Sequence, residues 1–269
     1  MINYLSTFIN TLNHPINRAQ PLKTIWKIVY WKLNQLTLKL PSLVDLGNSI
    51  KCICYPDSSY GGMVVYTTYP DYEVAMGIKK NLPGGGIFVD VGANIGYMSL
   101  VAATVSNTKI HSFEPSPIAY PRLVENINLN NLGSRVKLNN LLVSSSNKPI
   151  YFFDDDRSEL SHIVKSDEQG IKIKSTTLDT YCSKNKIKKI DVLKIDVEGA
   201  ELSVLKGARK MLLTHNIKHI YCELNCASRQ YGSTNSEVLS YLKSLGYRYS
   251  KIPRDIDNKV FNLHAWTNH

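Results

Sequence analysis

The chain has 269 residues, 43% of them hydrophobic, which is enough to bury one substantial core with a small extension. Its formal charge of +10 is scattered along the chain, without an arginine-rich stripe or an RNA-binding aromatic motif, which argues against a nucleic-acid partner. Five cysteines without a framework spacing, no bilayer-length apolar run and no signal-peptide core predict a cytoplasmic protein with reduced thiols.

Residues 1–50 are predicted to form a helical N-terminal extension, separate from a single domain over residues 51–269. Within the extension, residues 21–40 interleave apolar side chains with lysines in the spacing of a basic amphipathic helix, which Pro41 would close. Two roles stay open for this helix. It can pack on the main domain or on a second subunit of a homo-oligomer, or it can dock on a membrane surface.

Residues 52–55 and 63–67 are predicted to form two strands with a glycine-containing turn between them. A helix over residues 71–80 follows. The glycine-rich loop at residues 83–86 then delivers the chain to a strongly apolar strand.

From residue 87 onward, strand and helix patterns alternate. The predicted strands are 87–91, 109–113, 136–143, 191–195 and 217–224, and the predicted helices are 95–105, 117–130, 200–213 and 236–245. An irregular stretch with two short strands, 149–153 and 171–175, interrupts this order, and two further strand candidates end the chain. Such alternation predicts an α/β fold built on a mostly parallel sheet with helices on both faces.

The segment 87–96 reads as a buried strand that runs into a glycine-lined turn and then a helix. Gly92 and Gly96 let the backbone approach a ligand closely, at a point where helix N–H groups are still unpaired. Asp90 adds a carboxylate at the carboxyl end of the strand, which suits a ligand with an ammonium group better than an anionic dinucleotide. The turn therefore indicates S-adenosylmethionine rather than NAD, with contacts predicted for Asp90, Val91, Gly92, Ala93, Asn94 and Gly96.

Ligands of open parallel sheets lie outside the carboxyl ends of the strands, so the residues there matter most. In chain order these ends are Asp90-Val-Gly92, Glu114-Pro115, Val143, Asp196-Val-Glu198 and Glu223-Leu-Asn225. Four of the five carry a carboxylate. Glu114 lies 22 residues after Gly92, the spacing at which an acid accepts hydrogen bonds from ribose hydroxyls. We therefore add Glu114, Pro115, Val143 and Asp196 to the predicted cofactor contacts.

Several segments resemble the FkbM-type methyltransferases over about residues 70–225. They are Phe88–Gly96, Phe113-Glu-Pro115, Thr177-Leu-Asp179 and Leu193–Glu201. The resemblance implies a Rossmann-like class I methyltransferase sheet of seven strands, with the last strand inserted antiparallel. It also implies S-adenosylmethionine as cofactor and O-methylation of a hydroxyl of a sugar, glycan or glycosylated metabolite as the reaction. It does not identify the acceptor.

A hydroxyl is a poor nucleophile, so the reaction benefits from a base facing the transferred methyl group. Asp196 is the best-placed candidate, with Glu198 in support, and His162 and Glu223 are further candidates. The irregular stretch from Asp154 to Ile163 is expected to border the acceptor site. No resident metal is predicted, although Asp196, Glu223 and Asn225 offer oxygen ligands of the kind that Mg²⁺ takes.

Two alternative functions remain. One is methylation of nitrogen in a protein or nucleic acid. It is disfavoured because Asp196-Val-Glu-Gly stands where such enzymes carry an Asn/Asp-Pro-Pro-Tyr-type segment. The other is an S-adenosylmethionine-binding module without catalysis, against which the intact glycine turn and the strand-end carboxylates argue.

Overall fold

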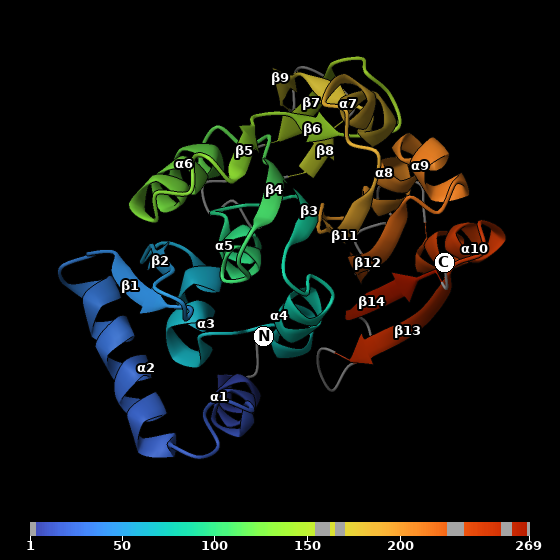
Figure 1. Cartoon of the computed structure of the whole chain (residues 1–269). Coiled ribbons are helices and arrows are strands. Elements are labelled where there is room, and N and C mark those ends of the chain that lie inside the picture. Colours follow the sequence, from blue (N-terminus) through green and yellow to red (C-terminus); the bar gives the residue numbers. More distant parts are fainter. Residues whose placement is uncertain (1–3, 154–161, 165–169, 225–233, 254–259, 268–269) are drawn as a thin grey trace.

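The computed structural model describes residues 4–153, 162–164, 170–224, 234–253 and 260–267. Within these residues a seven-stranded sheet has the order β13-β14-β12-β11-β3-β4-β5 (Figure 1). The strands are β3 (Gly86–Val91), β4 (Thr108–Phe113), β5 (Val136–Asn139), β11 (Ile190–Ile195), β12 (Ile217–Leu224), β13 (Arg248–Pro253) and β14 (Phe261–Trp266). Neighbours pair in parallel except for β14, which runs antiparallel to both β12 and β13. The predicted methyltransferase sheet, with its inserted antiparallel strand, is confirmed.

Helices cover both faces of this sheet because successive strand residues point to opposite sides. Phe88 enters an apolar cluster formed with α4 (Tyr72–Lys80), α5 (Tyr97–Ala103) and α6 (Ala119–Leu129). Its neighbour Val89 enters the cluster of the other face. That face is covered by α7 (Leu178–Lys184), α8 (Glu201–Gly207), α9 (Arg209–Leu213) and α10 (Asn235–Ser244). The two cores fix the sheet, and with it the strand ends that carry the predicted site.

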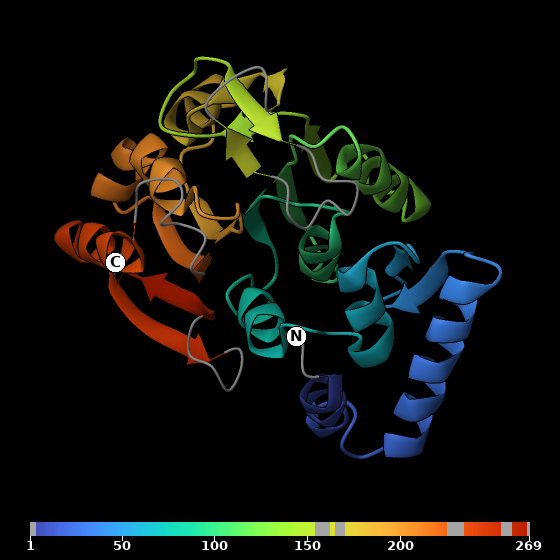
Figure 2. The same cartoon turned by 180° about the vertical axis from the view of Figure 1, so that it is seen from behind.

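The N-terminal elements lie against the α4–α6 side of the sheet (Figures 1 and 2). They are α1 (Tyr4–Asn13), α2 (Pro21–Leu36), the antiparallel pair β1 (Ser42–Asp45) and β2 (Lys51–Cys54), and α3 (Ser59–Thr67). Trp31 of α2 is 1% exposed and joins the core that contains Phe88. The division of the chain at residue 50 stays a prediction. In the part of the chain that the structure describes, no helix is both long and apolar enough to cross a membrane.

One predicted strand is wrong and another is interrupted. Residues 63–67 belong to helix α3, which begins where the Ser58 side chain accepts a hydrogen bond from the Gly61 amide at 2.9 Å. The predicted strand over residues 136–143 divides, because the Asn140 side chain donates to the Glu114 carbonyl at 2.9 Å and takes the chain out of the sheet. Its second half becomes β6 (Leu142–Val143), which pairs with β10 (Ser175–Thr176) outside the main sheet.

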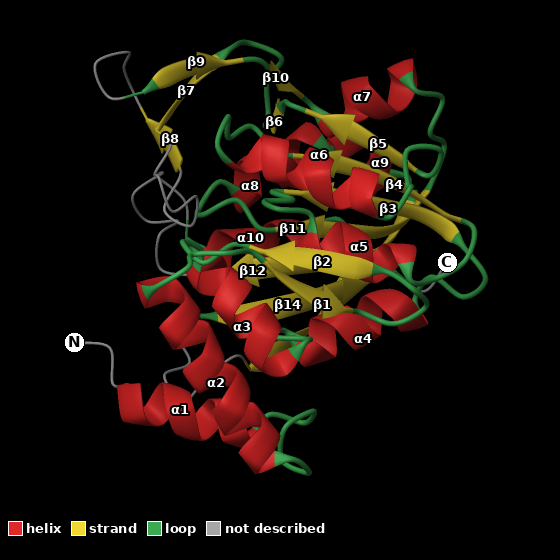
Figure 3. Ribbon diagram, turned by 90° about the vertical axis from the view of Figure 1, so that its left-hand side faces the viewer, coloured by secondary structure: helices red, strands yellow, loops and turns green. Residues whose placement is uncertain are grey.

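Two predicted helices also differ in extent. The helix over residues 200–213 is two short helices, α8 and α9, which meet at Ala208. The helix predicted over residues 21–40 ends at Leu36, because the Asn34 side chain bonds both the amide and the carbonyl of Leu40 and folds the following chain back. A small antiparallel sheet of β7 (Ile150–Phe153), β8 (His162–Val164) and β9 (Ile171–Ile173) lies at the end of the molecule opposite α1 and α2 (Figure 3).

Candidate functional site

The glycine turn after β3 is packed directly against the end of β11. Gly92 has φ +77°, and a Cβ built there would lie 1.8 Å from the main-chain oxygen of Asp196. The Asp196 amide in turn donates to the Val91 carbonyl at 3.0 Å. Glycine is therefore required at position 92 to bring two of the predicted strand ends together, in addition to any role in ligand approach.

Glu114 is held against the same turn. Its Oε2 accepts the Asn94 amide at 2.7 Å and its Oε1 accepts the Ser116 amide at 2.9 Å. The side chain is only 6% exposed. Asn94 itself has φ +50°, and Gly96, at φ +90°, precedes the first residue of α5. The predicted ribose acceptor thus lies beside the turn, at the distance of one hydrogen bond from its backbone.

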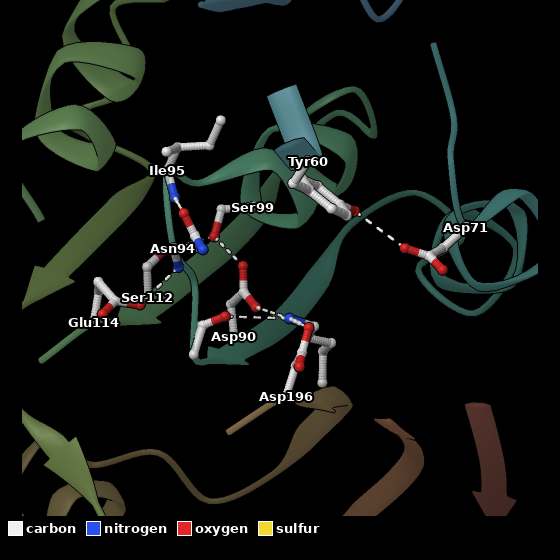
Figure 4. A network of polar contacts seen from close by, with 11 residues as sticks. Tyr60, Asp71, Asp90, Asn94, Ile95, Ser99, Ser112, Glu114 and Asp196 are labelled. Carbon is white, nitrogen blue, oxygen red and sulfur yellow. Dashed lines mark hydrogen bonds and ion pairs between the residues drawn. The ribbon is translucent and has the colours of Figure 1, made fainter. Parts of the chain in front are cut away.

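Asp90 lies beneath the turn and is fully buried (Figure 4). The Ser99 hydroxyl donates to its Oδ2 at 2.6 Å. Lys194 Nζ lies 3.8 Å from Asp90 Oδ1, 3.1 Å from Asp196 Oδ2 and 3.2 Å from the Gly92 carbonyl. One lysine therefore connects the buried carboxylate, the glycine turn and the end of β11.

The electrostatics of this group follow from burial and pairing. Burial raises the pKa of Asp90, while the charge of Lys194 and the hydrogen bond from Ser99 oppose that rise. Burial alone would lower the pKa of Lys194, but the charges of Asp196 and Asp90 raise it above its usual value. Lys194 therefore carries a positive charge at neutral pH. Lys194 is not among the residues predicted from the sequence, although a lysine between Leu193 and Ile195 in a buried strand has to be paired.

An open cleft with about 530 Å³ of empty space, part of it open to solvent, lies in front of these groups. Five predicted site residues line it: Gly92, Ala93, Asn94, Asp196 and Glu223. The cleft therefore brings the glycine turn together with the carboxyl ends of β11 and β12.

Three carboxylates gather at the carboxyl ends of β11 and β12, and two of them, Asp196 and Glu223, line the cleft. One oxygen each from Asp196, Glu198 and Glu223 lies within 4.8 Å of the others, and all three side chains are half-buried. Glu198 has φ +47°, so the backbone after β11 adopts the left-handed conformation there. Such a set of oxygens could hold a hard divalent cation. The other oxygen donor suggested by the sequence, Asn225, lies outside the described residues.

Glu201 is a fourth acid close to this group. It is 1% exposed, and its Oε1 accepts the Gly199 amide at 2.8 Å. Burial raises its pKa to about 7, and the charges of Asp196 and Glu198 act in the same direction. Glu201 is the first residue of α8, so its carboxylate lies at the end of the helix where the helix dipole favours a negative charge.

Val143, Pro115 and His162 are not among the described lining residues of the cleft. Val143 is buried in β6 beside Thr176 of β10 and packs in the apolar core. The Pro115 carbonyl accepts a hydrogen bond from the Asn140 side chain at 3.3 Å. His162 begins β8 opposite Phe153, but its side chain and residues 154–161 lie outside the described part of the chain.

Two cleft-lining residues, Tyr60 and Asp71, come from the N-terminal half of the chain and are not among the residues predicted from the sequence. Tyr60 of α3 donates its hydroxyl to Asp71 Oδ2 at 3.1 Å, and both residues line the cleft (Figure 4). The Tyr60 ring also stands edge-on to Tyr97 of α5. Residue 60 falls in the predicted turn between residues 55 and 63, and such a position does not indicate a side chain that lines a cleft with Asp196. Tyr221 of β12 and Asn262 of β14 also line the cleft.

The methyltransferase FkbM domain matches residues 90–249. Methyltransferase sdnD of Sordaria araneosa is 34% identical over 170 residues, which cover 51% of this chain and 63% of that protein. Hexuronic acid methyltransferase AglP of Haloferax volcanii is 35% identical over 127 residues, which cover 47% of this chain and 52% of that protein. The matches thus span between half and two thirds of the length of these relatives.

Solved structures give weaker matches. An rRNA methylase from Streptococcus thermophilus superposes with a TM-score of 0.48 at 13% identity, over 74% of this chain and 97% of that chain. The METTL16 MTase domain superposes with a TM-score of 0.48 at 12% identity, over 76% of this chain and 69% of that chain. Scores of this size carry no argument about the substrate.

The domain match covers more than half of the chain and contains Glu114, the glycine turn and the carboxylate cluster. The order of the strands and the single inserted antiparallel strand agree with it. The chain therefore belongs to the FkbM family of methyltransferases, which take their methyl group from S-adenosylmethionine.

Proposed function

We propose that this methyltransferase acts on a hydroxyl of a sugar, in a glycan or a glycosylated metabolite. The observation that carries the proposal is the cluster of Asp196, Glu198 and Glu223 beside the glycine turn, because carboxylates can both bind sugar hydroxyls and accept a proton from one. The similarity to a protein named as a hexuronic acid methyltransferase supports a sugar acceptor. The location of the enzyme in the cytoplasm stays a prediction.

The residues of the cleft fit S-adenosylmethionine. Asp71, Asp196 and Glu223 line it with a single cation, Lys194, among its described lining residues, so the cleft favours a ligand with sulfonium and ammonium groups. Glu114 lies beside Asn94, where it would accept hydrogen bonds from the ribose. When bound, the cofactor supplies an electrophilic methyl group on a positively charged sulfur. The same acidic lining disfavours a phosphate backbone, which supports a non-nucleic-acid acceptor.

Asp196 is the residue we assign to the proton. Its side chain is 33% exposed, whereas that of Asp90 is not exposed at all, so only Asp196 of this pair can meet an acceptor. Lys194 holds one of its oxygens at 3.1 Å and so fixes the orientation of the carboxylate. Asp196 then takes the hydroxyl proton as the new carbon–oxygen bond forms, an effect of roughly 10²–10⁴-fold in rate.

Glu198 and Glu223 are assigned to neighbouring hydroxyls of the sugar. Both place an oxygen within 4.8 Å of an Asp196 oxygen, the spacing at which adjacent hydroxyl groups on one ring can be bound together. His162 and residues 154–161 stay proposals for the acceptor side.

A product screen tests the proposal. The purified chain is incubated with S-adenosylmethionine and a set of neutral and uronic-acid-containing oligosaccharides, and products are examined by mass spectrometry for the gain of one methyl group. Hydroxyl transfer predicts a methyl ether, which survives mild alkali. A product that loses its methyl group in alkali would be an ester of a carboxylate and would contradict the proposal. Methylation of protein or nucleic acid alone would favour nitrogen as the target.

A further inference from the structure

Helix α2 presents its apolar side to the solvent. Seven large apolar side chains, spaced three or four residues apart or next to one another, lie on one side of the helix and are exposed: Leu22, Ile25, Trp26, Val29, Tyr30, Leu33 and Leu36. We refer to these seven residues as the α2 apolar face. Leu22 and Leu36 are each 81% exposed and Trp26 is 66% exposed. Amphipathic helices of globular proteins normally turn such a face towards the core.

The opposite side of α2 holds the helix to the rest of the chain. Thr24, Trp31 and Asn34 are its buried residues. Trp31 packs on α3 where Gly62 leaves room, since a Cβ at Gly62 would lie 2.9 Å from its indole nitrogen. The Gln35 side chain donates to the Pro56 carbonyl at 2.6 Å. Because these contacts position the helix, the α2 apolar face is not needed for its attachment.

Exposed apolar residues are concentrated in this part of the molecule. Of 19 large hydrophobic residues that are exposed among those described, 13 lie between Phe8 and Leu43. Leu38, Leu40 and Leu43 continue the series directly after the helix. Figure 1 shows α2 at the outer edge of the molecule, with no described element beyond it. Exposed apolar surface of this extent is typical of an interaction site.

The charges around the α2 apolar face select its partner. Residues 1–44 contain no Asp or Glu, while Arg18 and four lysines lie among them. At about 3.6 residues per turn, Lys23 and Lys32 flank the face on opposite sides, each about a quarter turn from its centre. A symmetric contact between two copies would bring these like charges together. A surface that is apolar inside and anionic outside matches the face on both counts.

We propose that α2 docks this enzyme on a lipid bilayer that contains anionic phospholipids. The helix lies in the plane of the interface, with Trp26 and Leu33 in the boundary between headgroups and acyl chains. Lys23 and Lys32 extend to the phosphates at the two sides, with their aliphatic stems along the apolar face. This inference concerns the location of the enzyme and does not depend on the identity of its acceptor.

Vesicle co-sedimentation of the full chain tests the proposal. We expect binding to vesicles of phosphatidylcholine with phosphatidylglycerol, weaker binding to phosphatidylcholine alone, and a loss of the difference in high salt. The triple change Leu22→Ser, Trp26→Ser and Leu33→Ser should abolish binding. Leu129→Ser with Leu213→Ser, which alters exposed leucines of α6 and α9, should leave it intact. Absence of binding to the anionic vesicles at low salt would overturn the proposal.

A second pair of variants separates specific docking from general attraction of a basic protein. Lys23→Gln with Lys32→Gln should lower the affinity for anionic vesicles by roughly thirtyfold. Lys184→Gln with Lys188→Gln removes the same charge from another exposed region and should have a far smaller effect. Equal losses in the two double variants would contradict docking through α2.

Tryptophan quenching then locates the contact. Lipids brominated on their acyl chains should quench Trp26, which is exposed, but spare Trp31, which is buried. The quenching should disappear in Trp26→Tyr. If instead the chain is a dimer in solution that dissociates on the triple serine change, the face is a subunit interface and membrane docking is rejected. Methyl transfer to a soluble acceptor should be unchanged in every variant, so a failure here is distinguishable from a failure of the proposed reaction.

Discussion

At the scale of single residues, the site depends on Lys194. It is 9% exposed, and it is the cation between the fully buried Asp90 and the half-buried Asp196. A buried carboxylate without a cation is costly, whereas a well-paired one can be nearly neutral. The strand-end carboxylates could be predicted from the sequence because acids after apolar strands are conspicuous. The lysine that holds them could not be placed without knowing the register in which β11 lies beside β3.

The role of Lys194 predicts an effect on stability. Lys194→Met should lower the free energy of unfolding by about 3–5 kcal/mol near neutral pH, because it leaves Asp90 buried without a cation. Adding Asp90→Asn should restore part of the loss, since asparagine can still accept the Ser99 hydrogen bond. Urea denaturation of the single and double variants measures both effects. A double variant less stable than Lys194→Met alone would contradict the pairing.

Glu201 predicts a pH dependence. Its pKa rises from 4.5 in an open chain to about 7 in the fold, chiefly because of burial. A group with a raised folded pKa contributes stability that is fully present below pH 4.5 and is lost as the pH rises through 7. The loss amounts to about 3 kcal/mol. Glu201→Gln should therefore flatten the decline in stability over this window and raise the melting temperature at alkaline pH. An unchanged decline in the variant would show that another group is responsible.

At the scale of elements, the site depends on the contact between the glycine turn after β3 and the end of β11. The sequence predicted both strands and the turn because their apolar runs and glycines are local signals. It did not predict α3, because residues 63–67 are as apolar as a strand and only the Ser58 cap and the contact with Trp31 favour a helix. Asn140 likewise ends the pairing after β5 through a contact with the distant Glu114 carbonyl. Local patterns do not contain such long-range hydrogen bonds.

This contact predicts different losses of stability when alanine replaces two glycines that share a positive φ. Gly92 is packed on the Asp196 carbonyl, whereas a Cβ at Gly84, at φ +72°, would meet nothing within 4 Å. Gly84→Ala should cost about 1 kcal/mol for the backbone conformation alone. Gly92→Ala should cost about 3 kcal/mol or more, because the turn and the end of β11 must separate. Thermal denaturation compares the two. Equal losses would mean that the turn can relax without moving Asp196.

At the scale of the whole molecule, amphipathic helices with a similar periodicity turn their apolar sides in opposite directions. The helices on the sheet turn their apolar sides inward, as in the case of Val74 and Ile78 of α4. Helix α2 turns its apolar face outward and is held by Trp31 and polar contacts. Periodicity predicted the helix but not the direction of its apolar side. That direction depends on whether another part of the chain provides a surface against which the apolar side can pack. The alternation of strands and helices, by contrast, determined the sheet and therefore the edge at which the site lies.

The assignment of Asp196 can be tested by separating binding from chemistry. With an acceptor from the oligosaccharide screen, Asp196→Asn should lower the rate at saturating S-adenosylmethionine by roughly 10²–10⁴-fold. The dissociation constant of the cofactor, measured by isothermal titration, should change far less than the rate, because asparagine can still accept the hydrogen bond from Lys194 and the carboxylates of Asp71 and Glu223 remain in the cleft. Ser203→Ala, on α8 outside the described cleft lining, serves as the matched control and should keep both values. If Asp196→Asn instead weakens cofactor binding and leaves the saturated rate intact, Asp196 belongs to the cofactor site and the account of the proton is wrong.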